Sequence, residues 1–310
     1  MGCPDWPKCF DQWVPPTQES QLPENYREIH STKRGKKIQK FASLLDKIGL
    51  ANKAEEIRND KSLLIEERFN ARKTWIEYIN RLLGALTGLF AVFFAVSSLQ
   101  FRRTNRLKTF TAFAGLLLIG FNGWLGSIVV ATNLLPGVVS VHFIFAFLAA
   151  AVIMVAVHNR FEMLFREQGV FFKGLFLVSL GMSLVQIVLG TLVRENVDYL
   201  IKTQPSFKGN SLDETMMGQV MLFHKLWSWV VVGFGLFVFY QIKIKIGKSM
   251  LLRAQVIILC IWAIQFATGV VNLWYALPPI SQLIHIVFGS VLFGIQMYIC
   301  IAFYNKYKEG

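Results

Sequence analysis

The sequence predicts an all-α integral membrane protein with two repeat-related transmembrane four-helix bundles, in which seven of the expected eight helices are present. The chain has 310 residues, of which 54% are hydrophobic, and its mean hydropathy is +0.46. Its apolar runs are about 20 residues long, enough to cross ~30 Å of hydrocarbon as helices. In addition, a glycine–histidine pattern recurs at the same spacing in two regions far apart in the chain.

The polar segment 1–76 precedes the first apolar run and carries Cys3 and Cys9, six residues apart. On the oxidising side of a membrane, such a pair can close a disulfide loop. Two interpretations remain open, a structural loop and a redox-active pair. Within the same segment, charged residues alternate with apolar ones over 36–58 at a helical period, which predicts an amphipathic helix. This helix is expected to lie on the outer surface, as a lid or as a solvated appendage.

Seven membrane spans follow, and they fall into two domains. The first bundle comprises residues 77–157 and the second comprises residues 174–303. The individual spans are expected at 77–99, 109–131, 138–157, 174–193, 219–241, 254–275 and 281–303. The interruptions at 132–137 and 276–280 are short enough only for tight turns, so the helices that flank them are antiparallel neighbours.

The net charge of +13 is distributed in a way that indicates a membrane rather than a nucleic acid as the partner. Lys and Arg residues follow the first, third, fifth and last spans, whereas the two tight turns carry none. Such an alternation is typical of the positive-inside rule. The C-terminus is therefore expected to be cytoplasmic and residues 1–76 to lie on the outer side.

This topology requires a highly charged segment of 76 residues to cross the membrane with no preceding helix. A simpler hypothesis is that a first transmembrane helix precedes this sequence. An upstream helix would restore eight spans, with both ends of the protein inside.

The repeat places histidines at equivalent positions. Gly126 precedes His142 by 16 residues, Gly269 precedes His285 by the same distance, and the two copies are 143 residues apart. With nearly the same offset, His224 corresponds to Asn80. A histidine repeated at one depth of a membrane favours haem ligation over the alternative of a hydrogen bond between helices.

The second bundle therefore offers His224 and His285 as two axial haem ligands, and the first offers His142 opposite Asn80. Arg81 and Lys225 lie next to two of these positions and are expected to pair with haem propionates.

Glu77 is the only carboxylate within the predicted spans, and it lies three residues before Asn80, on the same helix face. An acid at this depth is a candidate functional residue. The alternative is an interfacial residue that stabilises the start of the helix near Lys73.

These residues resemble the haem A synthase family, which converts haem O to haem A for cytochrome oxidases. The resemblance covers nearly the whole chain. It is carried by Cys3-Pro-Asp-Trp-Pro-Lys-Cys9, by Glu77-Tyr-Ile-Asn-Arg-Leu82, by 123–136 and by His142, His224 and His285.

The resemblance implies that haem b lies between His224 and His285 as a redox relay, and that haem O is the substrate, with His142 as its ligand. It also implies oxidation of a ring methyl group to the alcohol and then to the aldehyde. Glu77 would assist proton removal, and Cys3 and Cys9 would stabilise the outer loop or exchange electrons with a partner.

The expected partners are haem O synthase as the supplier of the substrate, an unidentified electron acceptor and the lipid of a bacterial inner membrane. A homo-oligomer is compatible with the sequence. The position of Asn80 is a histidine in the family pattern, so the substrate haem is expected to be held by His142 alone. Two other functions remain open, a b-type electron-transfer cytochrome and a non-enzymatic haem chaperone for oxidase assembly.

Overall fold

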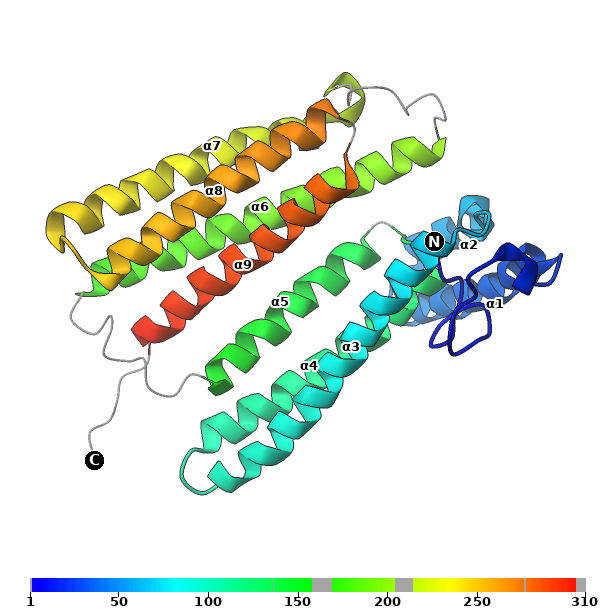
Figure 1. Cartoon of the computed structure of the whole chain (residues 1–310), viewed down its shortest axis with the longest axis horizontal. Coiled ribbons are helices and arrows are strands. Elements are labelled where there is room, and N and C mark those ends of the chain that lie inside the picture. The colour runs from blue at the N-terminus through cyan, green and yellow to red at the C-terminus, as the bar shows by residue number, and fades with distance from the viewer. Residues whose placement is uncertain (1, 136, 158–168, 204–213, 276, 305–310) are drawn as a thin grey trace. The chain divides into compact units, whose positions relative to one another are not determined.

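The computed structural model describes residues 2–135, 137–157, 169–203, 214–275 and 277–304. The described residues form helices and turns without a named strand, as the sequence predicts. The N-terminal segment contains α1 (Tyr26–Lys47) and α2 (Ala51–Asn59), together with two short 3-10 helices, η1 (Glu19–Gln21) and η2 (Lys61–Leu64). The long helices are α3 (Ala71–Ser98), α4 (Arg106–Ala131), α5 (Val138–Val157), α6 (Gly169–Thr203), α7 (Glu214–Lys245), α8 (Met250–Trp274) and α9 (Pro279–Tyr304) (Figure 1).

Each of the seven predicted spans coincides, to within one residue at its end, with part of a helix that is long and apolar enough to cross a membrane, which confirms the multi-pass prediction. The observed spans are longer than most of the predicted ones because polar residues continue the helices. Asn70 caps α3 by accepting a hydrogen bond from the Lys73 amide at 3.1 Å. Near the end of α6, Arg194 pairs with Asp198 at 2.8 Å, with i to i+4 spacing. As a result, the apolar helix of α6 extends to Asp198 and contains Glu195, so Glu77 is not the only carboxylate in the observed spans.

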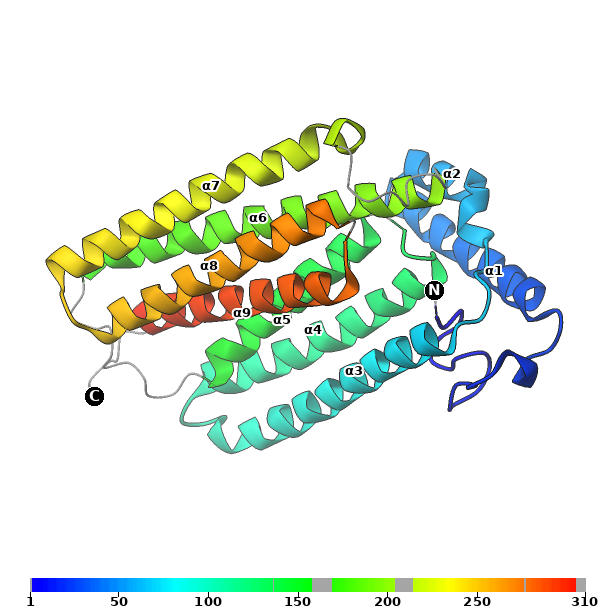
Figure 2. The same cartoon turned by 45° about the horizontal axis from the view of Figure 1, so that its top comes forward.

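The chain forms two compact units, Met1–Ile153 and Met154–Gly310. In the second unit, α6 packs against α7 and α9, and α8 also packs against α7 and α9, so the four helices close into a ring (Figure 2). In this ring α7 lies diagonally opposite α9. The core between the helices is apolar, with Phe176, Val238, Ile242 and Ile258 almost fully buried.

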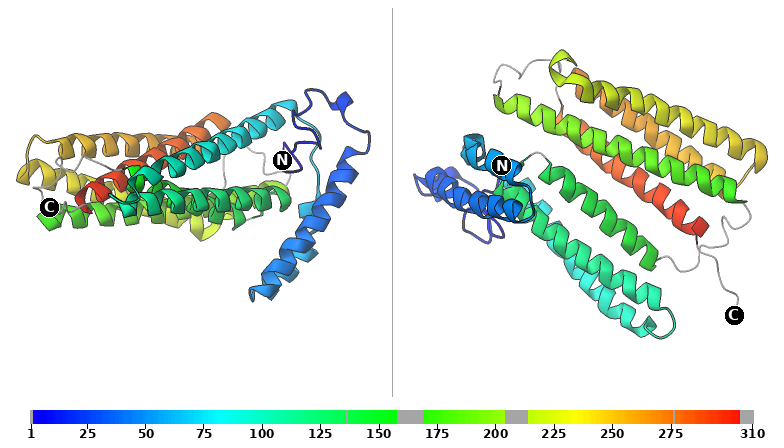
Figure 3. Two further views of the ribbon diagram at one scale, coloured as in Figure 1. Left: turned by 90° about the horizontal axis from the view of Figure 1, so that it is seen from below. Right: turned by 180° about the vertical axis from the view of Figure 1, so that it is seen from behind.

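In the first unit, α3 and α4 form an antiparallel hairpin, which is closed by η3 (Leu99–Phe101) and a short turn. Asn105 caps α4 by accepting a hydrogen bond from the Lys108 amide at 3.0 Å. At the far end of this hairpin, α1 packs against α4 and runs at a steep angle to it (Figure 3).

The prediction of one amphipathic helix over 36–58 is wrong. The structure has two helices instead, which are separated by Gly49 at φ +85°. Glycine takes this left-handed conformation without the steric cost that a side chain would bring, so the chain turns there. The buried residues of α1 recur every three or four positions along one face, and its C-terminal half packs against α2, η2 and Leu135.

A buried ion pair completes the N-terminal segment. Arg34 from α1 lies 2.9 Å from Glu66, and their side chains are 1% and 8% exposed. Burial raises the pKa of Glu66, although the charge of Arg34 opposes this shift.

Candidate functional site

Three histidines from the predicted site each pack against a glycine on the preceding helix. His142 on α5 faces Gly126 on α4, His224 on α7 faces Gly190 on α6, and His285 on α9 faces Gly269 on α8. A Cβ atom added to these glycines would lie 3.3, 3.3 and 3.7 Å from the corresponding imidazole Cε1. The first two distances are tighter than ordinary van der Waals contact, so the rings approach closely because the neighbouring residue has no side chain.

An asparagine or glutamine lies four positions before each of these glycines. In the second unit, its side-chain amide donates a hydrogen bond to the backbone of the helix that carries the histidine. Gln186 Nε2 donates to the His224 carbonyl at 3.3 Å, and Gln265 Nε2 donates to the His285 carbonyl at 2.7 Å. In the first unit, Asn122 occupies the equivalent position before Gly126. The repeat in the sequence identified Gly126 and Gly269 but missed Gln186 with Gly190. Their repeat counterpart would lie upstream of the first span, so comparing the two copies did not reveal them.

The ring of His285 is oriented by Thr268. The Thr268 hydroxyl donates to the Ile264 carbonyl at 2.8 Å, and its oxygen lies 2.9 Å from His285 Nδ1. With the hydroxyl proton assigned to the Ile264 carbonyl, the Thr268 oxygen is the acceptor of a hydrogen bond from Nδ1–H of His285. This assignment leaves Nε2 with a free lone pair, the state in which a neutral imidazole binds a metal.

The rings of His142 and His224 differ from that of His285, because their buried Nδ1 atoms have no hydrogen-bond partner within the described residues. Gln186 Nε2 lies 3.4 Å from His224 Nε2, which is long for a hydrogen bond. Imidazoles that are half-buried and incompletely bonded fit a ligand more readily than they fit a packed core.

The positions of two histidines in the second unit are compatible with the predicted haem. His224 and His285 come from α7 and α9, which are diagonal members of the four-helix ring. Each imidazole packs against a glycine on a neighbouring helix of the ring, His224 against Gly190 on α6 and His285 against Gly269 on α8. Two imidazoles presented from opposite helices are the donor set of a bis-histidine haem.

Glu77 and Arg81 have a different environment from the one predicted. Glu77 Oε2 accepts hydrogen bonds from the backbone amides of Gly2 and Cys3 at 2.9 and 3.2 Å, while its Oε1 pairs with Arg81 at 2.6 Å. Arg81 also donates to the carbonyls of Cys3, Asp5 and Lys8 at 3.1, 2.6 and 3.2 Å. The two side chains therefore hold the cysteine loop against the start of α3. The predicted roles in proton removal and propionate binding would therefore have to be filled by side chains that already hold the loop.

The cysteine loop itself is closed by the disulfide Cys3–Cys9, and both cysteines are fully buried. The loop lies directly on the helix, since a Cβ on Gly2 would come within 2.5 Å of the Lys73 backbone. Thr74 Oγ1 donates to the Gly2 carbonyl at 2.8 Å and fixes the same contact.

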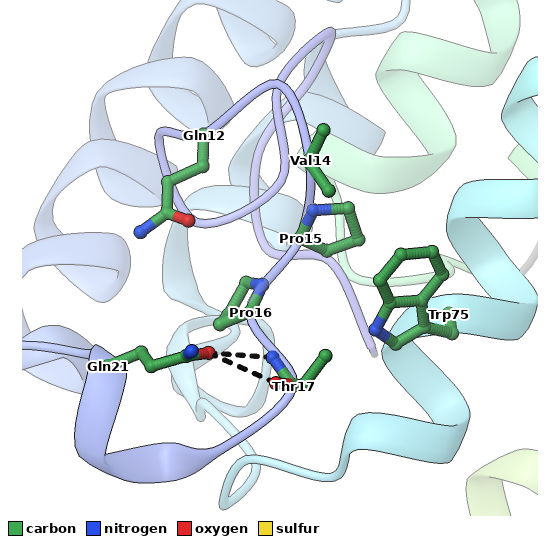
Figure 4. A pocket seen from close by; sticks show the side chains of 7 residues that line it. All are labelled: Gln12, Val14, Pro15, Pro16, Thr17, Gln21 and Trp75. Carbon is green, nitrogen blue, oxygen red and sulfur yellow. Dashed lines mark hydrogen bonds between the residues drawn. The ribbon is translucent and has the colours of Figure 1, made fainter.

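The two remaining predicted residues differ in exposure. Asn80 is exposed and none of its side-chain atoms takes part in a hydrogen bond between described residues, whereas Lys225 is half-buried beside His224. A surface pocket lies between the N-terminal loop and α3, lined by Gln12, Val14, Pro15, Pro16, Thr17, Gln21 and Trp75 (Figure 4). Gln21 Oε1 accepts a hydrogen bond from the Thr17 amide across it at 2.8 Å. Because none of the lining residues is an acid, a base or a nucleophilic thiol, this pocket is not the candidate site.

Comparison with known proteins gives one match. A family model described as cytochrome oxidase assembly protein matches residues 49–297, which is more than half of the chain and includes all three histidines. The cysteine loop lies before the matched region. The searches of curated proteins and of solved structures returned no match.

Proposed function

The chain belongs to the COX15-CtaA family of cytochrome oxidase assembly proteins, and from this membership we propose that it is a haem A synthase, an oxidoreductase. In this proposal it oxidises a ring methyl group of haem O to the formyl group of haem A. The observation that carries the proposal is the pair His224 and His285 on opposite helices, each packed against a glycine.

His224 and His285 would hold haem b in the second unit. When bound, haem b supplies one-electron transfer. Thr268 fixes the tautomer and the orientation of His285, and Gln186 and Gln265 fix the backbone of the two histidine-bearing helices. Such supporting contacts are commonly required for tight and well-oriented metal ligation.

His142 would orient the substrate haem O in the first unit. Gly126 allows close approach to the imidazole ring, and Asn80 is a poor iron ligand. We therefore expect one axial ligand for the substrate, with the other face open for oxidation. Oxidation of the methyl group to the alcohol takes an oxygen atom from water and releases two electrons and two protons. Oxidation of the alcohol to the aldehyde releases two more of each, so an external electron acceptor is required.

Glu77 has two candidate contributions. With both carboxylate oxygens engaged by hydrogen-bond donors, its first contribution is to position the cysteine loop. Its Oε1 accepts from Arg81 alone and so keeps one acceptor position, and this is the oxygen that would accept a proton from the reacting carbon. Haem O synthase is the proposed supplier of the substrate, and an inner membrane is the proposed location.

The test is to express the chain, alone and with an added upstream helix, in a host that makes haem O but no haem A. Haems are then extracted and identified by mass spectrometry. We expect the alcohol or aldehyde derivative, and we expect it to disappear in His142→Ala. Recovery of only haem b and unaltered haem O from both forms would reject the synthase and favour a haem carrier or chaperone.

A further inference from the structure

The N-terminal segment brings together three side chains that carry metal-binding atoms. Asp5 and Asp11 lie on either side of Cys9 in the loop, and His30 comes from α1. One carboxylate oxygen of each aspartate and one ring nitrogen of His30 all lie within 4.8 Å of one another. His30 is 19 residues after Asp11, and neither helical periodicity nor the repeat predicts the cluster.

His30 gives an independent reason to expect a ligand. The residue is only 4% exposed, and its buried Nδ1 has no hydrogen-bond partner in the part of the chain that the structure describes. A buried polar atom without a partner is unfavourable, so such atoms usually have a bound water or ion in addition to the protein. The ring of Phe10 packs edge-on against the imidazole, with centroids 5.4 Å apart, and restricts its rotation.

Asp5 is already oriented by the loop. Its Oδ1 accepts a hydrogen bond from the Phe10 amide at 2.7 Å, and its Oδ2 accepts one from the Asp11 amide at 2.8 Å. Each oxygen of a carboxylate has two acceptor positions, so one remains on each oxygen of Asp5. Asp5 is also largely buried, at 8% exposure.

We propose that Asp5, Asp11 and His30 form a binding site for one divalent transition-metal ion, of which Zn²⁺ is the representative. One imidazole nitrogen and two carboxylates are a donor set that this ion accepts, with water completing the coordination. The two aspartate charges balance the charge of the ion.

Lys33 competes with the ion. Its Nζ lies 2.5 Å from Asp11 Oδ2, and both side chains are about half-exposed. Such a surface ion pair contributes little to stability, so a divalent ion displaces the ammonium group from the aspartate. Metal and Lys33 therefore alternate at Asp11.

The bound ion would join α1 to the cysteine loop. Arg81 already holds the opposite side of this loop through the Cys3, Asp5 and Lys8 carbonyls. The site would thus connect α1, the disulfide loop and α3, and this role is separate from haem binding.

The test is titration of the full chain in detergent, after treatment with a chelator, using Co²⁺ as an optical probe and Zn²⁺ as its competitor. Because the bundle histidines also bind metal, the informative quantity is the difference between wild type and variants. We expect His30→Gln to remove one equivalent of binding. Asp11→Asn, at an exposed position that tolerates the change, should weaken that equivalent at least tenfold.

Two further variants make the test specific. Lys33→Gln should tighten binding severalfold, because it removes the competing charge. Asp46→Asn, which changes another α1 carboxylate paired with Arg58, should titrate as wild type. Unchanged stoichiometry and affinity in both His30→Gln and Asp11→Asn would overturn the proposal, whether or not the chain binds haem.

Discussion

The structure shows a role for Gly190 that was not predicted from the sequence. A Cβ atom added to Gly190 would lie 3.3 Å from the His224 Cε1, so the missing side chain allows the imidazole to approach this closely. We expect Gly190→Ala to push the ring away and to lower the haem b content of the purified protein severalfold, as measured by its optical spectrum. Gly181→Ala on the same helix is the matched control, because a Cβ there meets no atom within 4 Å. Equal haem content in the two variants would contradict the proposed packing.

Arg81 leads to a second prediction at the residue scale. Its guanidinium contacts three carbonyls of the cysteine loop and Glu77, and lysine does not reproduce this fork of donors. In Arg81→Lys we expect the buried disulfide to be reduced at least severalfold faster by an external thiol, as followed by alkylation of the released cysteines. Arg72→Lys, at an exposed position of the same helix, should behave as wild type. An unchanged reduction rate in Arg81→Lys would show that the loop is held by other contacts.

The site residues differed in how far the sequence alone predicted them. His142, His224 and His285 were identified because a histidine at a repeated position in an apolar helix is unusual. The contacts of Glu77 and Arg81 were not predicted, since hydrogen bonds to a loop backbone leave no pattern of residue types. Asp5 and His30 were missed for a similar reason, because chain folding brings them together without regular spacing.

At the scale of elements, α1 and the residues after η2 are joined by the buried pair of Arg34 and Glu66. Removing one charge leaves the other buried and uncompensated, a change that typically costs about 3–5 kcal/mol. We expect Glu66→Gln to lower the hydrogen-exchange protection of α1, with a smaller effect from Asp46→Asn on the exposed pair with Arg58. Equal protection in both variants would show that the buried pair does not hold α1.

The contribution of Glu66 should also depend on pH. Burial raises its pKa above the ordinary value of 4.5, so the folded segment binds this proton more tightly than the unfolded chain does. The stability that Glu66 contributes through protonation is therefore fully present below the ordinary value and is lost as pH rises through the folded-state pKa. The difference in α1 protection between wild type and Glu66→Gln should decrease as pH rises above the ordinary value of 4.5. If the difference instead increases with pH, the pKa of Glu66 is lowered by folding and not raised.

The existence of each spanning helix followed from composition, but the ends of the helices did not. Apolar runs predict the spans because only regular helices satisfy the backbone in lipid. The caps at Asn70 and Asn105 and the Arg194–Asp198 pair extend helices into polar sequence, which a hydropathy pattern does not detect. The division of the predicted helix over 36–58 was missed because a single glycine, Gly49, determines it.

At the scale of the whole molecule, both units contain the glycine–imidazole contact, but they differ at the position of the second candidate haem ligand. The second unit has His224 where the first has Asn80, and Asn80 is exposed. We expect the haem O that binds to wild type to be high-spin, and the haem O that binds to Asn80→His to be low-spin. The measurement is the difference between the optical and electron paramagnetic resonance spectra of the protein with and without haem O. A low-spin difference spectrum in wild type would contradict single-histidine ligation.

The way in which the cysteine loop is anchored has a consequence for how its sequence can vary. Glu77 and Arg81 contact only backbone amides and carbonyls of Gly2, Cys3, Asp5 and Lys8. They therefore recognise the path of the chain and do not depend on the identity of the side chains at its tip. Trp6, which is 45% exposed, is free to be exchanged without loss of the loop's position. The side chains at the tip can thus be substituted to suit a different neighbouring protein or lipid, while α3 keeps the disulfide in the same position.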